Sequence, residues 1–441
     1  MKRAAPGLTT LTRHASQRLW LARAIAWALL LGGWLVLGTL GRQYLPQVAG
    51  GQVPVALWLA TAGGAQALVG RWRWSAPALR SVLLVTGIAA ATALALRGRT
   101  PAGVLCAAAA WALLLVAVSL AVRSLRRLQH GLPPAPIGPA LAGACLAWAV
   151  AGDLGLLRHA VAPVVLALGL AALALAWLLP CPAADATPAS TSTDVAPDAG
   201  QDDACGRRSG GFGGCPAGLF GCALPLLQPG RWRHPVAWPQ AAAALTMLPM
   251  MASLPAMDDW CGDLRWPATA GTALHLGVMV LPAALLQGCR IPLQGLQRWV
   301  ALLLALGGAA LGWPGLSGLM AASLLHGLAW SVASAATLAP RVGQPGAAAV
   351  VEPDGALHCA GAGAVRPTVA RTALAVPAGP VMWGAALLTA SAVMLLGQAV
   401  AQFGPAALVA VHASLAGLGL VGGLAGLGER RAPPQPLAKP G

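Results

Sequence analysis

Residues 160–180 read AVAPVVLALGLAALALAWLLP, an apolar run without a charged side chain, and a polar segment follows it directly from Cys181. A helix needs about 20 predominantly apolar residues to cross the hydrocarbon core of a bilayer. Runs of this kind recur from one end of the chain to the other, so the sequence predicts an all-α, polytopic membrane protein. The run at 160–180 decides the arrangement, because it is the last of six before the polar segment.

The composition agrees with a membrane protein. The 441 residues are 57% hydrophobic and only 9% charged, whereas a soluble domain carries about 25% charged residues. The net charge of +16 would fit a nucleic-acid-binding protein if it formed one surface patch. The Arg residues instead lie between the apolar runs, which is typical of membrane topology and argues against a nucleic-acid partner.

The runs divide the chain into two sets of six. Residues 1–180 form a predicted N-terminal six-helix half, 181–235 a flexible cytoplasmic linker rich in Pro, Ser, Thr and Gly, and 236–441 a C-terminal six-helix half. We therefore expect about 12 transmembrane helices in a 6+6 arrangement, each near the length a bilayer requires. The predicted spans are 20–40, 53–69, 81–96, 103–122, 138–152, 160–180, 236–257, 266–287, 296–312, 315–338, 376–400 and 403–427.

The positive charges set the orientation. If the N-terminus is cytoplasmic, nearly all of the 28 Lys and Arg residues fall in cytoplasmic segments; Arg23 lies within the first span, and those outside are Arg42, Arg97, Arg99, Arg158 and Arg265. Cytoplasmic loops are the ones that carry excess Lys and Arg. This bias predicts an even number of spans with both termini in the cytoplasm. We expect a multi-pass protein of a bacterial inner membrane, in contact with the lipid bilayer.

Two short motifs suggest the chemistry. Met247 and Met251 are four residues apart, as are His275 and Met279, so each pair shares one face of a helix. The pairs lie on the predicted seventh and eighth spans at overlapping depths. Thioether sulfur and imidazole nitrogen suit a soft ion such as Cu(I). We predict that these four residues bind copper inside the membrane, as a transported ion and not as a catalytic cofactor.

Other residues lie at a similar depth. His326, His412 and Met394 fall on the tenth, twelfth and eleventh predicted spans, while the N-terminal half has no Met or His at the centre of a span. Met is a common packing residue and a buried His can bond a neighbouring helix, so both structural and ligand roles stay open for these three.

The Met247-xxx-Met251 and His275-xxx-Met279 motifs resemble those of the CcoA-like copper importers of the major facilitator superfamily, which carry them on the seventh and eighth spans. The resemblance implies a major-facilitator-like fold, copper import, a role in copper homeostasis and a supply of copper to cytochrome oxidase assembly. It also implies Met247, Met251, His275 and Met279 as the metal-binding set.

Flanking residues offer further hypotheses. Met257 and Cys261 could pass copper inward from the outer surface, with acidic neighbours gathering cations. A cytoplasmic copper acceptor is a possible partner, and a set of loop residues could receive the ion: Cys205, Cys215, Cys222, His358 and Cys359. None of their spacings matches a zinc or iron–sulfur pattern.

Two alternative functions stay open. The first is a non-transporting membrane protein that holds haem or copper during oxidase maturation, since His is a common axial ligand of haem. The second is a facilitator for an organic solute, in which Met and His only pack. The sequence has no Ser/His/Asp array, phosphate loop or paired carboxylates, so we do not expect an enzyme.

Overall fold

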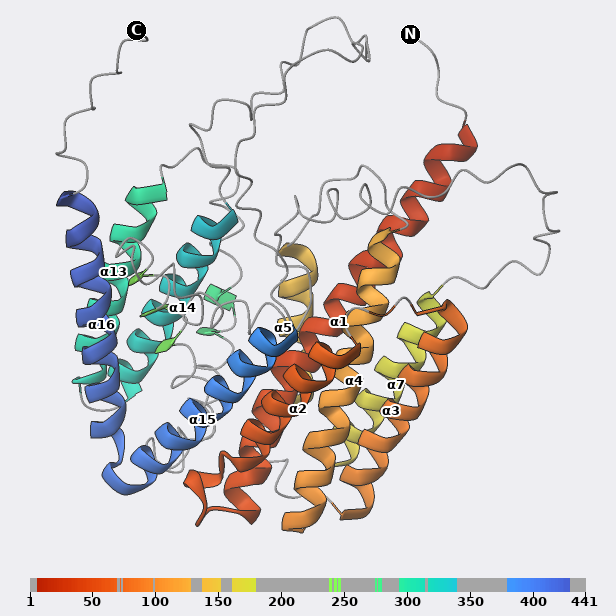
Figure 1. Ribbon diagram of the computed structural model, residues 1–441, viewed down its shortest axis with the longest axis horizontal. Coiled ribbons are helices and arrows are strands. Elements are labelled where there is room, and N and C mark those ends of the chain that lie inside the picture. The colour runs from red at the N-terminus through yellow and green to blue at the C-terminus, as the bar shows by residue number, and fades with distance from the viewer. Residues whose placement is uncertain are drawn as a thin grey trace, which may run out of the picture.

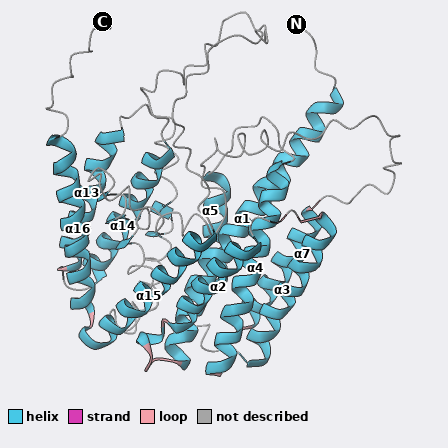
Figure 2. Ribbon diagram, viewed as in Figure 1, coloured by secondary structure: helices cyan, strands magenta, loops and turns pink. Residues whose placement is uncertain are grey.

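The computed structural model describes part of the chain, and every regular element in that part is helical (Figures 1 and 2). It describes residues 6–69, 72, 74–97, 100–127, 137–151, 161–179, 238–239, 242–243, 245–246, 274–275, 277–279, 293–313, 316–338 and 379–428. The longer elements are α1 (Pro6–Tyr44), α2 (Val53–Val69), α3 (Ala76–Arg97), α4 (Pro101–Arg127), α5 (Ile137–Ala151), α7 (Ala162–Leu178), α13 (Leu293–Leu311), α14 (Leu316–Leu338), α15 (Gly379–Phe403) and α16 (Pro405–Gly428), with the short 3-10 turn η1 (Ala49–Gly51) after α1.

Local sequence explains where several helices begin and end. The hydroxyl of Thr100 accepts a hydrogen bond from the backbone N–H of Gly103 at 3.1 Å and caps α4, which then begins with Pro101. Between α15 and α16, Gly404 adopts φ 61°, a left-handed conformation that favours glycine at a helix end. Pro405 follows as the first residue of α16, where its missing N–H costs nothing.

The N-terminal helices, α1 to α7, enclose the larger described core. Helix α1 packs against α5 and α4, while α3 packs against α4 and α7. Trp34 and Trp58 are each 1% exposed and meet edge to face with ring centroids 6.0 Å apart, a favoured geometry for aromatic pairs. The indole N–H of Trp111 donates to the carbonyl of Leu29 at 3.0 Å, which fixes α4 against α1.

The C-terminal helices, α13, α14 and α16, form a second group, on the left of Figure 1. Helix α13 packs against both α14 and α16. Their own apolar cluster is small and consists of Ala, Val and Leu side chains such as Val300, Leu304 and Ala329. Small residues let membrane helices approach one another closely, which leaves little room for bulky side chains between these helices.

Helix α15 joins the two groups. It runs diagonally between them in Figure 1 and packs along α2 and η1, with a smaller contact to α16. A Cβ on Gly397 would overlap the carbonyl of Ala49 and the side chain of Gln52, so α15 lies directly against η1. The side-chain oxygen of Gln398 accepts a hydrogen bond from the N–H of Ala49 at 3.1 Å. Under the predicted topology this contact lies at the outer side of the membrane.

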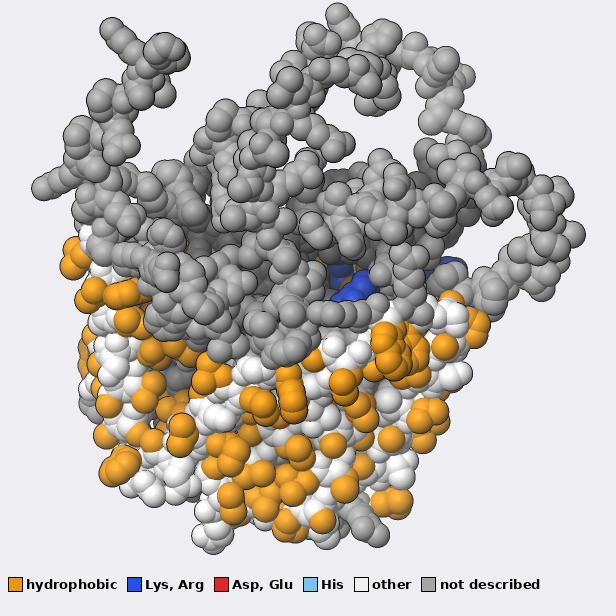
Figure 3. Space-filling view, in the orientation of Figure 1, with side chains coloured by type: hydrophobic (Ala, Val, Ile, Leu, Met, Phe, Trp, Pro, Cys, Tyr) orange, Lys and Arg blue, Asp and Glu red, His pale blue; other side chains and the backbone are white. Residues whose placement is uncertain are grey.

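Length, composition and surface character agree with a membrane location. Four helices of the described part are long and apolar enough to span a bilayer: Ser16–Tyr44, Ala76–Leu96, Pro101–Leu125 and Ala386–Phe403. Large apolar side chains point outward, among them Leu96 at 78% exposed, Trp177 at 76% and Leu395 at 73%. Figure 3 shows apolar side chains covering the lower part of the visible face. These exposed side chains are suited to lipid.

The predicted spans match the described helices well. The span predicted at 53–69 has the bounds of α2, and that predicted at 160–180 contains α7. Helix α1 starts at Pro6, far before the predicted 20, because a helix can continue beyond the apolar segment that hydropathy detects. The predicted spans at 236–257 and 266–287 are described only in short pieces, and the linker at 181–235 lies outside the described residues.

Candidate functional site

Three buried histidines gather among the C-terminal helices. His275 lies in the helical piece 274–275, His326 on α14 and His412 on α16, and their side chains are 0%, 1% and 0% exposed. The rings of His326 and His412 lie 4.2 Å apart, and His275 is bonded to the carbonyl of Ser323, three residues before His326 on α14. We call these three residues the histidine row. They come from three predicted spans, so only the folded chain brings them together.

His275 has a defined tautomer. Its Nδ1 lies 2.9 Å from the backbone carbonyl oxygen of Ser323 on α14. A carbonyl oxygen only accepts hydrogen bonds, so Nδ1 must carry the hydrogen, and in the neutral ring Nε2 then has a lone pair. Nε2 is buried and has no hydrogen-bond partner among the described residues. Metal-binding histidines typically show this arrangement, in which one ring nitrogen donates to a carbonyl and the other binds the metal.

His412 repeats this arrangement on α16. Its Nδ1 lies 2.8 Å from the carbonyl oxygen of Leu408, one helical turn earlier. The same reasoning places the hydrogen on Nδ1 and the lone pair on Nε2. Within the described part of the chain, Nε2 of His412 is also buried and makes no hydrogen bond of the usual distance and angle, although the backbone of Thr246 lies near the ring. In both His275 and His412 the lone pair is therefore on Nε2.

His326 is held in place by packing. Its ring lies against that of His412, with centroids 4.2 Å apart and planes tilted by 58°. On the neighbouring helix α13, a Cβ added to Gly307 would lie 2.8 Å from Cε1 and Nε2 of His326. Neither ring nitrogen of His326 makes a hydrogen bond to the described residues that meets the usual limits of distance and angle. Gly307 thus leaves room for an imidazole that even alanine would displace.

The surroundings of the row carry no negative charge within the described ranges. All Asp and Glu residues of the chain lie in segments that the structure does not describe. In addition, no three His, Cys, Asp or Glu side chains among the described residues lie close enough together to hold a metal ion. The histidine row is therefore an uncharged series of nitrogen donors and not one preformed cage.

The predicted ligand set is partly described. His275 lies in the row, and Met279, one helical turn later, is 5% exposed and belongs to the same core as Trp330 of α14 and the N-terminal helices. Met247 and Met251 lie outside the described residues. The structure therefore places one predicted pair inside the protein, between the two groups of helices, and does not test the four-residue set.

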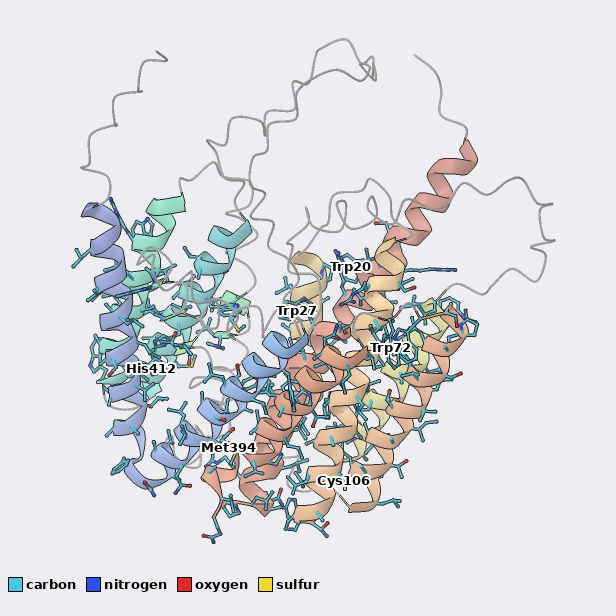
Figure 4. The ribbon with its side chains drawn as sticks, in the orientation of Figure 1. Trp20, Trp27, Trp72, Cys106, Met394 and His412 are labelled. Atoms are coloured by element: carbon cyan, nitrogen blue, oxygen red, sulfur yellow. The ribbon has the colours of Figure 1, made fainter. Side chains whose placement is uncertain are left out.

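The other candidates have different outcomes. Met394 on α15 is 37% exposed, and Figure 4 shows it on a different helix from His412; it does not belong to the buried row. His326 and His412 do. The proposed outer feeder, Met257 and Cys261, lies outside the described residues, as do the loop candidates Cys205, Cys215, Cys222, His358 and Cys359.

Two contributors were missed at the sequence level. The Ser323 carbonyl orients His275, and Gly307 makes room for His326. Every residue has a backbone carbonyl, so the sequence does not indicate which carbonyl binds the histidine. Gly307 is followed by Gly308 in an otherwise apolar span, a signal of close approach between helices that did not reveal which side chain approaches.

Comparison with known proteins establishes the fold. No family model matches the chain, and no curated protein matches its sequence. The nucleoside transporter NupG is similar in structure, with a TM-score of 0.52 at 14% identity over 95% of this chain and 100% of that one. A mutant of the peptide transporter POT gives a TM-score of 0.51 at 15% identity, covering 94% of both chains.

The same POT mutant in complex with alafosfalin gives a TM-score of 0.50 at 16% identity, again over 94% of both chains. At such low identity these likenesses concern the fold. The chain has the all-helical, major-facilitator-like fold of these transporters, and it is a multi-pass membrane protein. These solved structures are titled as transporters.

Proposed function

We propose that this protein is a membrane transporter that imports copper through a site formed by Met247, Met251, His275 and Met279. Transport is supported by the likeness in fold to NupG and POT. Neither of those names refers to copper, so the choice of ion rests on the chemistry of the residues. The main observation behind this choice is His275, because its Nδ1–H donates to the Ser323 carbonyl and its Nε2 is left for a ligand.

The donor types favour a soft ion. His275 and Met279 are four residues apart and both buried, so their nitrogen and sulfur lie on one face of the same segment. The four proposed ligands include neither a carboxylate, which Mg²⁺ or Ca²⁺ would prefer, nor a thiolate, which would retain copper tightly. Neutral sulfur and nitrogen donors can bind Cu(I) and still release it, as a carrier requires.

Movement of the ion would use the joint between the two groups of helices. Transporters of this type rock one half against the other around a central site. In this chain the contact between η1 and the end of α15, through Ala49, Gly397 and Gln398, would close the outer side. We propose that this contact separates when copper enters and forms again before copper leaves toward the cytoplasm.

Uptake of radioactive copper by cells tests this proposal. Cells that carry the wild-type protein should accumulate copper, whereas a deletion strain, Met251→Ala and His275→Ala should not, at equal protein levels in the membrane. Met394→Ala is a matched control, because Met394 lies on the surface of α15, and it should behave as wild type. Unchanged uptake in the deletion strain, where no second importer exists, would disprove the import function.

A facilitator for an organic solute is the second candidate. The observation that favours it is that the solved transporters of this fold are named for nucleosides and peptides. Such a solute could accept or donate hydrogen bonds to the buried imidazoles. Competition separates the two candidates: nucleosides or dipeptides in excess should leave copper uptake unchanged if copper is the cargo. Saturable uptake of such a solute that ignores copper would favour this second function.

A further inference from the structure

We propose that His326 and His412 form a second copper position, made of nitrogen ligands alone, between α14 and α16 and next to His275. It extends the proposed function, on which it rests for the identity of the ion. Its residues differ from the four Met and His ligands proposed above. The two positions would share one region of the membrane, since all three histidines lie about ten residues from the outer ends of their predicted spans.

The first argument is the state of the nitrogens. Nε2 of His412 carries a lone pair because Nδ1 is fixed on the Leu408 carbonyl. Neither nitrogen of His326, nor Nε2 of His412, makes a hydrogen bond of the usual distance and angle within the described part, although the backbone of Ala322 lies near the His326 ring and that of Thr246 near the His412 ring. Buried polar atoms without partners cost free energy and call for an explanation such as a bound ion. A cation bound by one nitrogen of His326 and by Nε2 of His412 would supply it.

The second argument is that the position is built by its neighbours. The rings of His326 and His412 lie 4.2 Å apart, so both can approach the same ligand with small rotations. Gly307 of α13 lies under the His326 ring, where a Cβ would overlap it. A histidine with only a structural role is usually held by hydrogen bonds to its ring. The His326 ring makes no hydrogen bond of the usual distance and angle within the described part, and the glycine on α13 leaves room for it.

The third argument concerns which ion fits. No Asp or Glu lies among the described residues, so the hard, oxygen-preferring ions Mg²⁺ and Ca²⁺ have no charged ligand here. Imidazole suits copper and other late transition metals. Since three described side chains do not form a single cage, the pair would hold the ion only in passing, with His275 nearby through its bond to the Ser323 carbonyl of α14.

Copper binding by the purified full-length protein tests the pair. Cu(I) would be titrated without oxygen against a competing chelator, in a protein in which Met247→Leu and Met251→Leu remove the predicted sulfur ligands. We expect this protein still to bind copper, with imidazole scattering in the X-ray absorption spectrum. Adding His326→Asn or His412→Asn should weaken the remaining binding by about tenfold or more.

His14→Asn on α1 is the matched control, because His14 lies on an N-terminal helix, and it should leave the affinity unchanged. His412→Gln replaces any variant that fails to elute as a folded protein. Affinity within about twofold of the parent in both His326 and His412 variants would overturn the inference. Failure of the proposed function looks different: cells would show no copper uptake, while the purified protein would still bind copper through the pair.

Discussion

The N-terminal and C-terminal helices differ in the side chains that they bury. The N-terminal helices bury large side chains, such as Trp34, Trp58 and Trp111, in one continuous core. The C-terminal helices have a small apolar cluster and bury the histidine row instead. Since lipid tails are as apolar as leucine, packing and not water exclusion holds membrane helices together. Within the described residues, the large buried side chains thus lie mostly in the N-terminal helices, while the buried histidines lie among the C-terminal ones.

The largest effect should come from the packed half. Trp34→Ala removes a fully buried indole and its edge-to-face contact with Trp58, so we expect a loss of about 3–5 kcal/mol in the free energy of unfolding. Thermal unfolding of the purified protein in detergent measures it. Trp177→Ala, at a side chain 76% exposed on α7, should change stability little. Equal losses in both variants would contradict a packed N-terminal core.

Next in size is a change at the histidine row. Gly307→Ala places a Cβ 2.8 Å from the His326 ring, and overpacking of this kind costs about 1–3 kcal/mol. We expect weaker copper binding as well as lower thermal stability, because the ring must move. A matched control is Gly417→Ala on α16, where a Cβ meets nothing within 4 Å. If the two alanine variants bind copper equally, Gly307 does not position His326.

The joint between the halves should be sensitive at Gly397. A Cβ there would overlap Ala49 and Gln52, so Gly397→Ala must push α15 away from η1. We expect a loss of about 1–3 kcal/mol and a slower uptake of copper in cells. Gly384→Ala lies on the same helix in open space and serves as the control. Wild-type uptake and stability in Gly397→Ala would show that the contact is not tight.

The smallest effect is expected from a single hydrogen bond. Gln398→Leu removes the acceptor for the Ala49 N–H, which is bonded at 3.1 Å, and should cost about 0.5–1.5 kcal/mol. Gln402→Leu, at an exposed position of the same helix, is the control for the change in polarity. Thermal unfolding of both variants side by side measures the difference, and a loss no greater than in the control would exclude a role for this bond.

Hydropathy predicted most of the described helices because a bilayer sets the length of an apolar run. The bounds of α2 agree with the prediction, while the early start of α1 was missed because its first turns are too polar for a hydropathy signal. The number of spans stays a prediction, since those at 236–257 and 266–287 are described only in part.

The sequence predicts a depth for each residue in a span, but it does not predict the direction in which the side chain points. Counting residues from the span ends placed His275, His326, His412 and Met394 at similar depths. Which way a side chain faces depends on how helices pack, and packing turned His326 and His412 toward each other and Met394 toward the surface. The bond from His275 to the Ser323 carbonyl could not be predicted, since every residue has a carbonyl and only the folded structure shows which one lies near the ring.

Copper flux into liposomes that contain the purified protein tests the central claim most directly. Wild-type protein should fill the liposomes with copper over time, and His275→Asn should reduce the rate to that of empty liposomes, because it removes the imidazole nitrogen that the Ser323 carbonyl leaves available. Met394→Leu should transport as wild type. Equal flux in wild type and His275→Asn, or no flux above empty liposomes for the wild type, would contradict copper transport through this site.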